Sequence, residues 1–244
     1  MSWSGIIGGT GALTLTPRAG NDSDRPQHTP YGETSSPLLT WQTGATQICF
    51  IARHGLDGSI PPHLVNYRAN IWALHEAAPD CVIGLNAVGG IADWASPARL
   101  VFPDQLVDYT WGREHTFSDG RMQPLQHIEF THPFGREIHR RLVEVAGGLS
   151  LDFHPGGVYG VTQGPRLETA AEIDRMQRDG CDIVGMTALP EAALAGEVSL
   201  DYAICAVVVN WAAGRAPEGA GIHDEIRRYV DAGMSQVIRL LEAL

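Results

Sequence analysis

The chain lacks clusters of basic side chains, and this absence removes two classes of partner. Its 244 residues include 17 Lys and Arg against 28 Asp and Glu, which gives a formal net charge of -11 at pH 7. Nucleic acids and anionic membrane surfaces attract proteins through clustered Lys and Arg, so we expect neither as a partner. The sequence favours a small molecule or another protein instead.

Cysteine is scarce, and no segment has the length and apolar character of a membrane span. The four cysteines, Cys49, Cys81, Cys181 and Cys205, lack the spacing of a zinc site or a disulfide framework, so we expect neither. The N-terminus has no basic stretch followed by an apolar one, as a signal peptide would. We therefore expect a non-secreted protein in reducing, cytoplasmic surroundings.

Short apolar runs alternate with helical patterns along the chain. The apolar runs predict strands buried on both faces, at residues 5–7, 48–52, 81–85, 105–107, 158–161, 183–184 and 202–209. The helical patterns cover residues 64–78, 134–146, 169–179, 190–196 and 223–244. This alternation predicts an α/β sheet. Without a repeat or a linker, we expect one domain over residues 1–244, with long loops at 17–38 and 110–133 that are either functional or disordered.

Three predicted strands end in residues suited to an anion. The turn Gly-Gly-Thr-Gly at 8–11 offers backbone amides and the Thr10 hydroxyl, although an isolated motif of this kind is more often a tight turn or a fragment of a nucleotide-binding fingerprint. Arg53 follows the strand at 48–52, and a guanidinium can bind two phosphate oxygens at once or form a surface ion pair. Thr187 stands at a predicted helix start, as an N-cap or as an anion ligand. Ligands of α/β sheets bind at the carboxyl ends of strands, so the three together favour a phosphate site.

Two further polar side chains follow predicted strands. Glu168 is either a carboxylate favoured by the helix dipole or an acceptor for a ligand, while Arg166 beside it is a candidate to hold this corner of the fold together. Asn210 ends the run at 203–209, where a buried amide must be hydrogen-bonded, either to a turn or to a ligand.

Six segments, taken together, resemble the trimeric purine nucleoside phosphorylase and methylthioadenosine phosphorylase family over nearly the whole chain. They are Gly-Gly-Thr-Gly (8–11), Arg-His-Gly (53–55), Val-Asn-Tyr-Arg-Ala-Asn-Ile (65–71), Gly-Pro-Arg-Leu-Glu-Thr (164–169), Gly-Met-Thr-Ala-Leu-Pro-Glu (185–191) and the strand ending at Asn210. Residues 62–67 look like the methylthionucleoside branch. The resemblance implies a mixed, strongly curved sheet flanked by helices, a homotrimer, and transfer of a pentosyl group to inorganic phosphate without a metal or organic cofactor.

The resemblance also implies roles for individual residues. Phosphate would be held by Thr10, Arg53, His54, the backbone around Ala87, and Thr187. The nucleoside would contact Met186, Leu167, Glu168, Asn210, Trp211 and Ala212, with His127 supplied by a neighbouring subunit. Asn210, Arg53 and Thr187 would carry catalysis.

The chain departs from the adenine-specific members where the base binds. Those members carry Asp at the positions of Asn210 and Ala212, and a small residue in place of Glu168. Glu168 can accept from N1–H and Asn210 can donate to O6 or N7 of a 6-oxopurine, whereas adenine presents the opposite pattern at its N1 edge. We therefore expect 6-oxopurine selectivity, with Asn210 stabilising the charge that develops on the leaving base.

The 5′ end of the substrate is less well defined by the sequence. An ungapped count places His223 beside the 5′ substituent, as in inosine-type enzymes, but one residue of slippage places Ile222 there, and His223 is an equally good start for the last helix. Gly58 replaces a phosphate-side His of the family, for which His63 is a candidate substitute. Phosphorolysis of 5′-methylthioinosine ranks first, an inosine and guanosine enzyme second and a methylthioadenosine enzyme third. A non-catalytic nucleoside binder and a hydrolytic nucleosidase are the alternatives from other classes.

Overall fold

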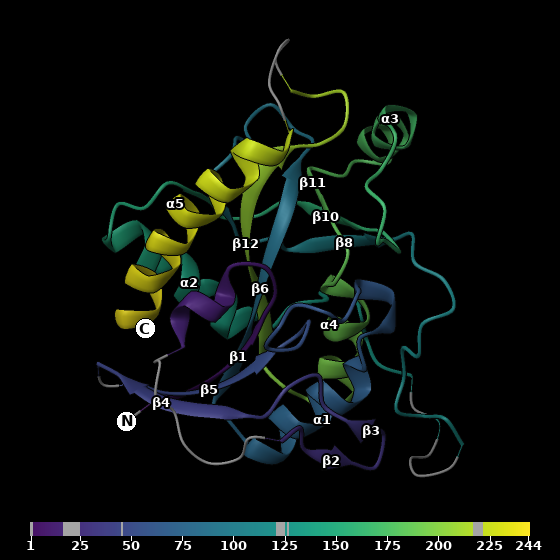
Figure 1. Ribbon diagram of the computed structural model, residues 1–244, viewed down its shortest axis with the longest axis vertical. Helices are drawn as coiled ribbons and strands as arrows, with labels where there is room; N and C mark the ends of the chain where they lie inside the picture. The colour runs from purple at the N-terminus through teal and green to yellow at the C-terminus, as the bar shows by residue number, and fades with distance from the viewer. Residues whose placement is uncertain (1, 17–24, 45, 121–124, 126, 217–221) are drawn as a thin grey trace.

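One mixed sheet of ten strands runs through the protein in a computed structural model that describes residues 2–16, 25–44, 46–120, 125, 127–216 and 222–244 (Figure 1). Its strands are β1 (Ser2–Gly8), β4 (Leu39–Thr43), β5 (Thr46–Ala52), β6 (Cys81–Gly90), β7 (Leu100–Val101), β8 (Gln105–Asp108), β9 (Phe153–His154), β10 (Val158–Val161), β11 (Ile183–Gly185) and β12 (Tyr202–Trp211). A separate hairpin pairs β2 (His28–Thr29) with β3 (Gly32–Glu33).

The long strand β6 organises this sheet because it has three partners. Its first half pairs in parallel with β1, most of its length pairs in parallel with β12, and its last two residues pair antiparallel with β11. The order β4-β5-β1-β6-β11-β10-β8 then places β8 and β10 across the direction of β6 and β12, so the sheet is strongly curved (Figure 1). The predicted α/β class with a mixed, curved sheet is confirmed.

Helices cover both faces of the sheet. They are α1 (Tyr67–Ala77), α2 (Arg136–Gly148), α3 (Ala170–Arg178), α4 (Ala188–Glu197) and α5 (Ile222–Glu242), with 3-10 turns η1 (Ala12–Leu15) and η2 (Pro62–Leu64). Successive strand residues point to opposite faces, so Ile6 packs in the cluster under α2 and α5, and Ile7 in the cluster under α1 and α4. Within the part of the chain that the structure covers, no helix combines the length and apolar character needed to cross a bilayer.

The predicted elements are present with shifted ends. The helix expected from residue 64 begins at Tyr67, because η2 occupies residues 62–64 and the Asn66 side chain caps α1 by accepting from the Ala69 amide at 3.1 Å. The last helix begins at Ile222, so His223 is part of it. The strand expected to end at Val209 continues to Trp211, with an irregular register between Val208 and Asn210.

Candidate active site

The carboxyl ends of β1, β5, β6, β11 and β12 converge on a cavity of about 290 Å³. Residues from all of these ends line it, as expected for a ligand site of an α/β sheet. The predicted site residues in its wall are Thr10, Arg53, His54, Ala87, Leu167, Glu168, Met186, Thr187, Asn210, Trp211 and Ala212. Gly9, from the turn at 8–11, also lines the cavity, and the lining residues to which sequence reasoning gave no role are Pro62, Val88, Gly89, Val184, Gly185, Val209 and Ala213.

Arg53 lies at the floor of this cavity with no exposed surface, and a carboxylate from another element occupies one side of it. Its Nε donates to Glu191 Oε1 at 2.5 Å and its Nη2 to Glu191 Oε2 at 2.9 Å. Nη2 also donates to Ile7 O, and Nη1 to Leu85 O at 3.0 Å. Arg53 therefore does not offer Nε and Nη2 to two phosphate oxygens, as expected, because both atoms already donate to the Glu191 carboxylate. Among the described residues, only Leu85 O accepts from Nη1, which leaves one N–H for a ligand.

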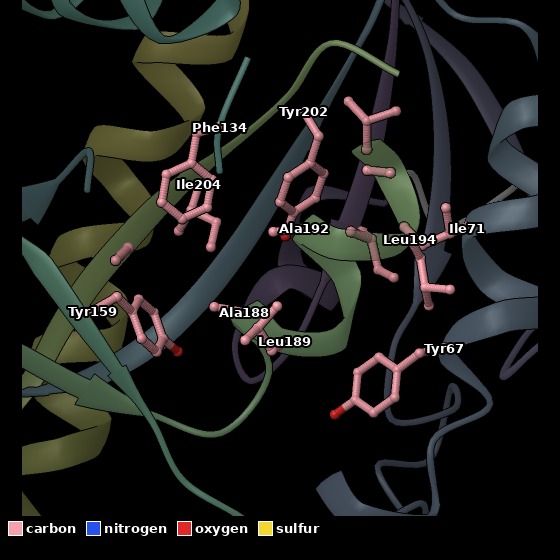
Figure 2. Packing of buried hydrophobic residues seen from close by; sticks show 14 of the residues in the cluster. Tyr67, Ile71, Phe134, Tyr159, Ala188, Leu189, Ala192, Leu194, Tyr202 and Ile204 are labelled. Carbon is pink, nitrogen blue, oxygen red and sulfur yellow. The ribbon is translucent and has the colours of Figure 1, made fainter. Parts of the chain in front are cut away.

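Glu191 makes this buried pair part of a larger network around α4. Its carboxylate has no exposed surface and also accepts from the Tyr202 hydroxyl at 2.9 Å. Figure 2 shows Tyr67, Tyr159 and Tyr202 arranged around α4. Burial and then the Glu191 charge raise the pKa of Tyr202 well above its ordinary value. Burial alone would lower the pKa of Arg53, but Glu191 outweighs burial and raises it. The pair is thus a fixed, ionised unit with no net charge.

His54 presents a hydrogen-bond acceptor to the cavity. Its Nδ1 lies 2.8 Å from Ile60 O, and since a carbonyl can only accept, Nδ1 must carry the proton. Burial, followed by the charge of Arg53, lowers the pKa of His54, so the ring is neutral at pH 7. Nε2 therefore has a free lone pair, and it lies on the side of Gly9. A phosphate bound here has to donate its own P–OH hydrogen to His54.

The turn after β1 and the start of α4 complete this end of the cavity. In the turn at residues 8–11 the Gly9 amide donates to Leu85 O at 3.2 Å, so this one amide does not face the cavity, while the exposed Thr10 lines it. Thr187 is the N-cap residue of α4 but caps no backbone amide; instead its hydroxyl accepts from Asn86 Nδ2 at 2.7 Å. The Thr187 proton can then be donated either to the nearby Tyr159 hydroxyl or to a ligand in the cavity.

Glu168 forms the opposite wall and is held by a hydroxyl. Thr162 Oγ1 donates to Glu168 Oε1 at 2.6 Å, a length typical of a charge-assisted bond. Glu168 is not in the first turn of α3, because Thr169 is the N-cap and Glu172 completes its capping box. Arg166 pairs with both oxygens of Glu172 at 2.7 and 2.8 Å, so it holds this corner as expected.

Asn210 reaches the cavity because β12 is irregular just before it. Val208 pairs with Val88 and Asn210 with Gly89, so Val209 is an extra residue, and such bulges re-aim side chains at sites. Asn210 Nδ2 donates one hydrogen to Trp211 O at 2.6 Å. Its second hydrogen is available to a ligand.

Comparison with known proteins places this geometry in a family. The model of the phosphorylase superfamily matches residues 4–244. The chain belongs to the phosphorylase superfamily. It is 45% identical over 239 residues to a probable S-methyl-5′-thioinosine phosphorylase of Xanthomonas campestris pv. campestris, covering 98% of this chain and 95% of that protein. It is 40% identical over 243 residues to a 6-oxopurine nucleoside phosphorylase of Pyrococcus furiosus, covering 98% and 90%.

A solved member of the superfamily shares the fold over the whole chain. The methylthioadenosine phosphorylase from Schistosoma mansoni in complex with adenine superimposes with a TM-score of 0.90 at 29% identity, covering 100% of this chain and 90% of that one. The resemblance inferred from the six sequence segments is therefore confirmed.

Of the three histidines expected near this phosphorylase site, the two with described side chains do not line the cavity of their own chain. His127 is exposed on the segment before α2. His63 lines a different cavity with Arg68 and Arg113, so the expectation that it substitutes for the family's His at Gly58 is not supported. The side chain of His223 lies outside the described part of the structure.

Arg113 is a structural residue of this superfamily member that sequence reasoning missed. Its Nη1 donates to Met186 O at 2.8 Å and Leu189 O at 2.6 Å, and its Nη2 donates to Gln163 O at 2.9 Å. Arg113 thus ties the loop after β10 to the loop after β11, which carries Met186 and Thr187. Arg113 lies in a long loop that has neither helical nor strand periodicity, so no sequence pattern pointed to its role. The described residues contain no group of three or more His, Cys, Asp or Glu placed to hold a metal ion.

Proposed function

We propose that this chain catalyses the phosphorolysis of 5′-methylthioinosine to hypoxanthine and 5-methylthioribose 1-phosphate. The observation that carries the proposal is the base wall, where Glu168 offers a held carboxylate, Asn210 offers an amide hydrogen and Ala212 offers no acid. This set complements N1–H and the O6 or N7 acceptors of a 6-oxopurine. The named relatives at 40–47% identity support the same substrate class.

In the proposed reaction a phosphate oxygen bonds to C1′ of the ribose while the C1′–N9 bond breaks and its electron pair stays on the purine. Phosphate is held by Thr10, Thr187, His54 and the remaining N–H of Arg53. The leaving purine gathers negative charge at N7 and O6, where the free hydrogen of Asn210 donates. Because this charge exists only as the bond breaks, the amide stabilises the transition state more than the substrate. Phosphate is already anionic, so the reaction needs no general base, metal or organic cofactor.

A second candidate is a 6-oxopurine nucleoside phosphorylase that accepts a 5′-hydroxyl group. The relative in Pyrococcus furiosus favours it, and the residue beside the 5′ substituent decides between the two. We further propose a homotrimer in the cytoplasm, in which the exposed His127 of one subunit closes the sugar pocket of another. Leu125, two residues before His127 in the chain, is an exposed large apolar side chain and supports a subunit contact here.

The test measures free base released from methylthioinosine, inosine and methylthioadenosine, each with and without phosphate. We expect release to require phosphate and hypoxanthine to leave faster than adenine. Equal turnover without phosphate would contradict phosphorolysis, and faster adenine release would contradict the roles of Glu168 and Asn210. Binding without turnover would indicate a nucleoside-binding protein.

A further inference from the structure

A second cavity of about 500 Å³ adjoins the base wall of the proposed active site. Three segments line it: the loop after β8, the loop after β10, and the first turns of α3. Glu168 belongs to the linings of both cavities. The second cavity holds none of the phosphate-side residues, so it is a separate compartment behind the carboxylate.

Packing and hydrogen bonding both show that the two cavities share a wall. Val184 and Ala212 from the first cavity and Tyr109 and Met176 from the second pack in one hydrophobic cluster. The shared carboxylate is turned toward the second cavity, because its Oε1 accepts from Thr162, which lines only that cavity. The Glu168 side chain therefore borders both compartments.

The position of the second cavity relative to the base follows from the proposed function. If Glu168 accepts from N1–H of a 6-oxopurine, then C2, the next ring atom, lies at the same carboxylate, and a group on C2 extends past it. The first cavity, at about 290 Å³, is already at the small end of ligand pockets, which are roughly 300–1,000 Å³, and must hold base and sugar. We infer that the second cavity is a subsite for a substituent carried on the 2-amino group of a guanine-type base.

The lining selects a neutral, flat or apolar substituent. Trp111 is 73% exposed, so an aromatic group can pack on it, while Met176 lines the cavity as a buried side chain of the hydrophobic cluster. The cations nearby are engaged: Arg166 pairs with Glu172 at 2.7 Å, and Arg175 lies 5.6 Å from the centre of the Tyr109 ring. An anionic substituent would find these cations already paired, whereas an aryl or alkyl group would cover exposed apolar surface of Trp111.

The experiment compares guanine with N2-benzylguanine as inhibitors of the phosphorolysis of inosine and methylthioinosine. We expect about a tenfold lower inhibition constant for N2-benzylguanine, because the benzyl group buries apolar surface in the second cavity. Thr110→Trp fills that cavity and should raise the constant for N2-benzylguanine about tenfold, with guanine changed less than twofold. Ser235→Trp, on the exposed face of α5, is the matched control and should change neither.

Two results would overturn the subsite. One is weaker inhibition by N2-benzylguanine than by guanine in the unmodified protein. The other is an equal rise in the inhibition constants of guanine and N2-benzylguanine in Thr110→Trp. That result would mean that the second cavity is part of the purine pocket or its entrance. Failure of the proposed function is recognised separately, because inosine and methylthioinosine would then release no base. In that case calorimetric titration of the protein with guanine and with N2-benzylguanine still compares how tightly the two bases bind.

Discussion

Replacing Glu191 with Gln removes the charge that neutralises Arg53 while keeping the shape of the side chain. The native carboxylate accepts two bonds from the guanidinium, at 2.5 and 2.9 Å, and one from Tyr202 at 2.9 Å. A hydrogen bond to a charged group contributes about 1.5–3 kcal/mol, and breaking a buried ion pair costs about 3–5 kcal/mol. The amide oxygen of Gln still accepts one bond, so we expect the free energy of unfolding to fall by about 3 kcal/mol.

Urea denaturation of the purified protein measures this loss, with Tyr202→Phe as a control that should cost about 1 kcal/mol through a single hydrogen bond. The double variant Arg53→Met with Glu191→Leu should recover part of the stability, because apolar groups can replace a buried pair at little cost, while the Tyr202 hydroxyl and the Ile7 and Leu85 carbonyls lose their partners. The double variant should nevertheless lack phosphorolysis, because it has lost the Arg53 side chain. A loss below 1 kcal/mol for Glu191→Gln would refute the reasoning, as would a double variant no more stable than the single one.

The remaining predictions concern the two ends of the cavity. Thr162→Val should lower kcat/KM for inosine about tenfold by freeing the Glu168 carboxylate, and Thr162→Ser should restore it; steady-state kinetics in which both variants are equally impaired would show that the hydroxyl does not matter. Asn210→Asp combined with Glu168→Ser should shift the ratio of kcat/KM toward methylthioadenosine at least tenfold over methylthioinosine, and an unchanged ratio would mean that other groups orient the base. The KM for phosphate should stay within twofold from pH 7 to 9, because burial and Arg53 lower the pKa of His54 and the ring is already neutral, while HPO₄²⁻ keeps its P–OH proton. A tenfold rise in the KM for phosphate per pH unit would show that His54 binds phosphate as a cation. We do not expect this rise, because Nε2 loses its lone pair only when the pH falls through the lowered pKa of His54.

The central strands were predictable because burial on both faces leaves a continuous apolar run. β10 occupies the expected residues 158–161, and β5, β6 and β12 differ only at their ends. The strands that sequence reasoning missed carry little pattern: β7 and β9 have two residues each, and β4, at the edge of the sheet, is only partly buried. Such segments pair because the rest of the sheet places them side by side, which no local pattern records.

The site was predictable where a residue's role depends on its place at a strand end. Thr10 and Asn210 line one cavity because the parallel strands β1 and β12 deliver their carboxyl ends to one edge of the sheet, and Thr187 joins them from the end of β11, which runs antiparallel to β6. The partners of these residues were not predictable. Glu191 meets Arg53 across 138 positions, and Arg113 reaches Met186 across 73. A sequence shows that a guanidinium stands at a strand end, but it does not show which acceptor the fold will bring to it.

The pairing of Arg53 with Glu191 also changes how the phosphate end would work. A phosphate bound there meets hydroxyls, the one remaining N–H of Arg53 and the acceptor of His54, but no uncompensated cation among the described lining residues. Its negative charge is therefore poorly balanced in the ground state. As the C1′–N9 bond breaks, the ribose gains positive character beside the phosphate. Only then is the negative charge of the phosphate matched at short range in a low-dielectric cavity. If phosphate binds at this end as proposed, Glu191 would raise the rate by keeping Arg53 from neutralising the nucleophile before the bond breaks.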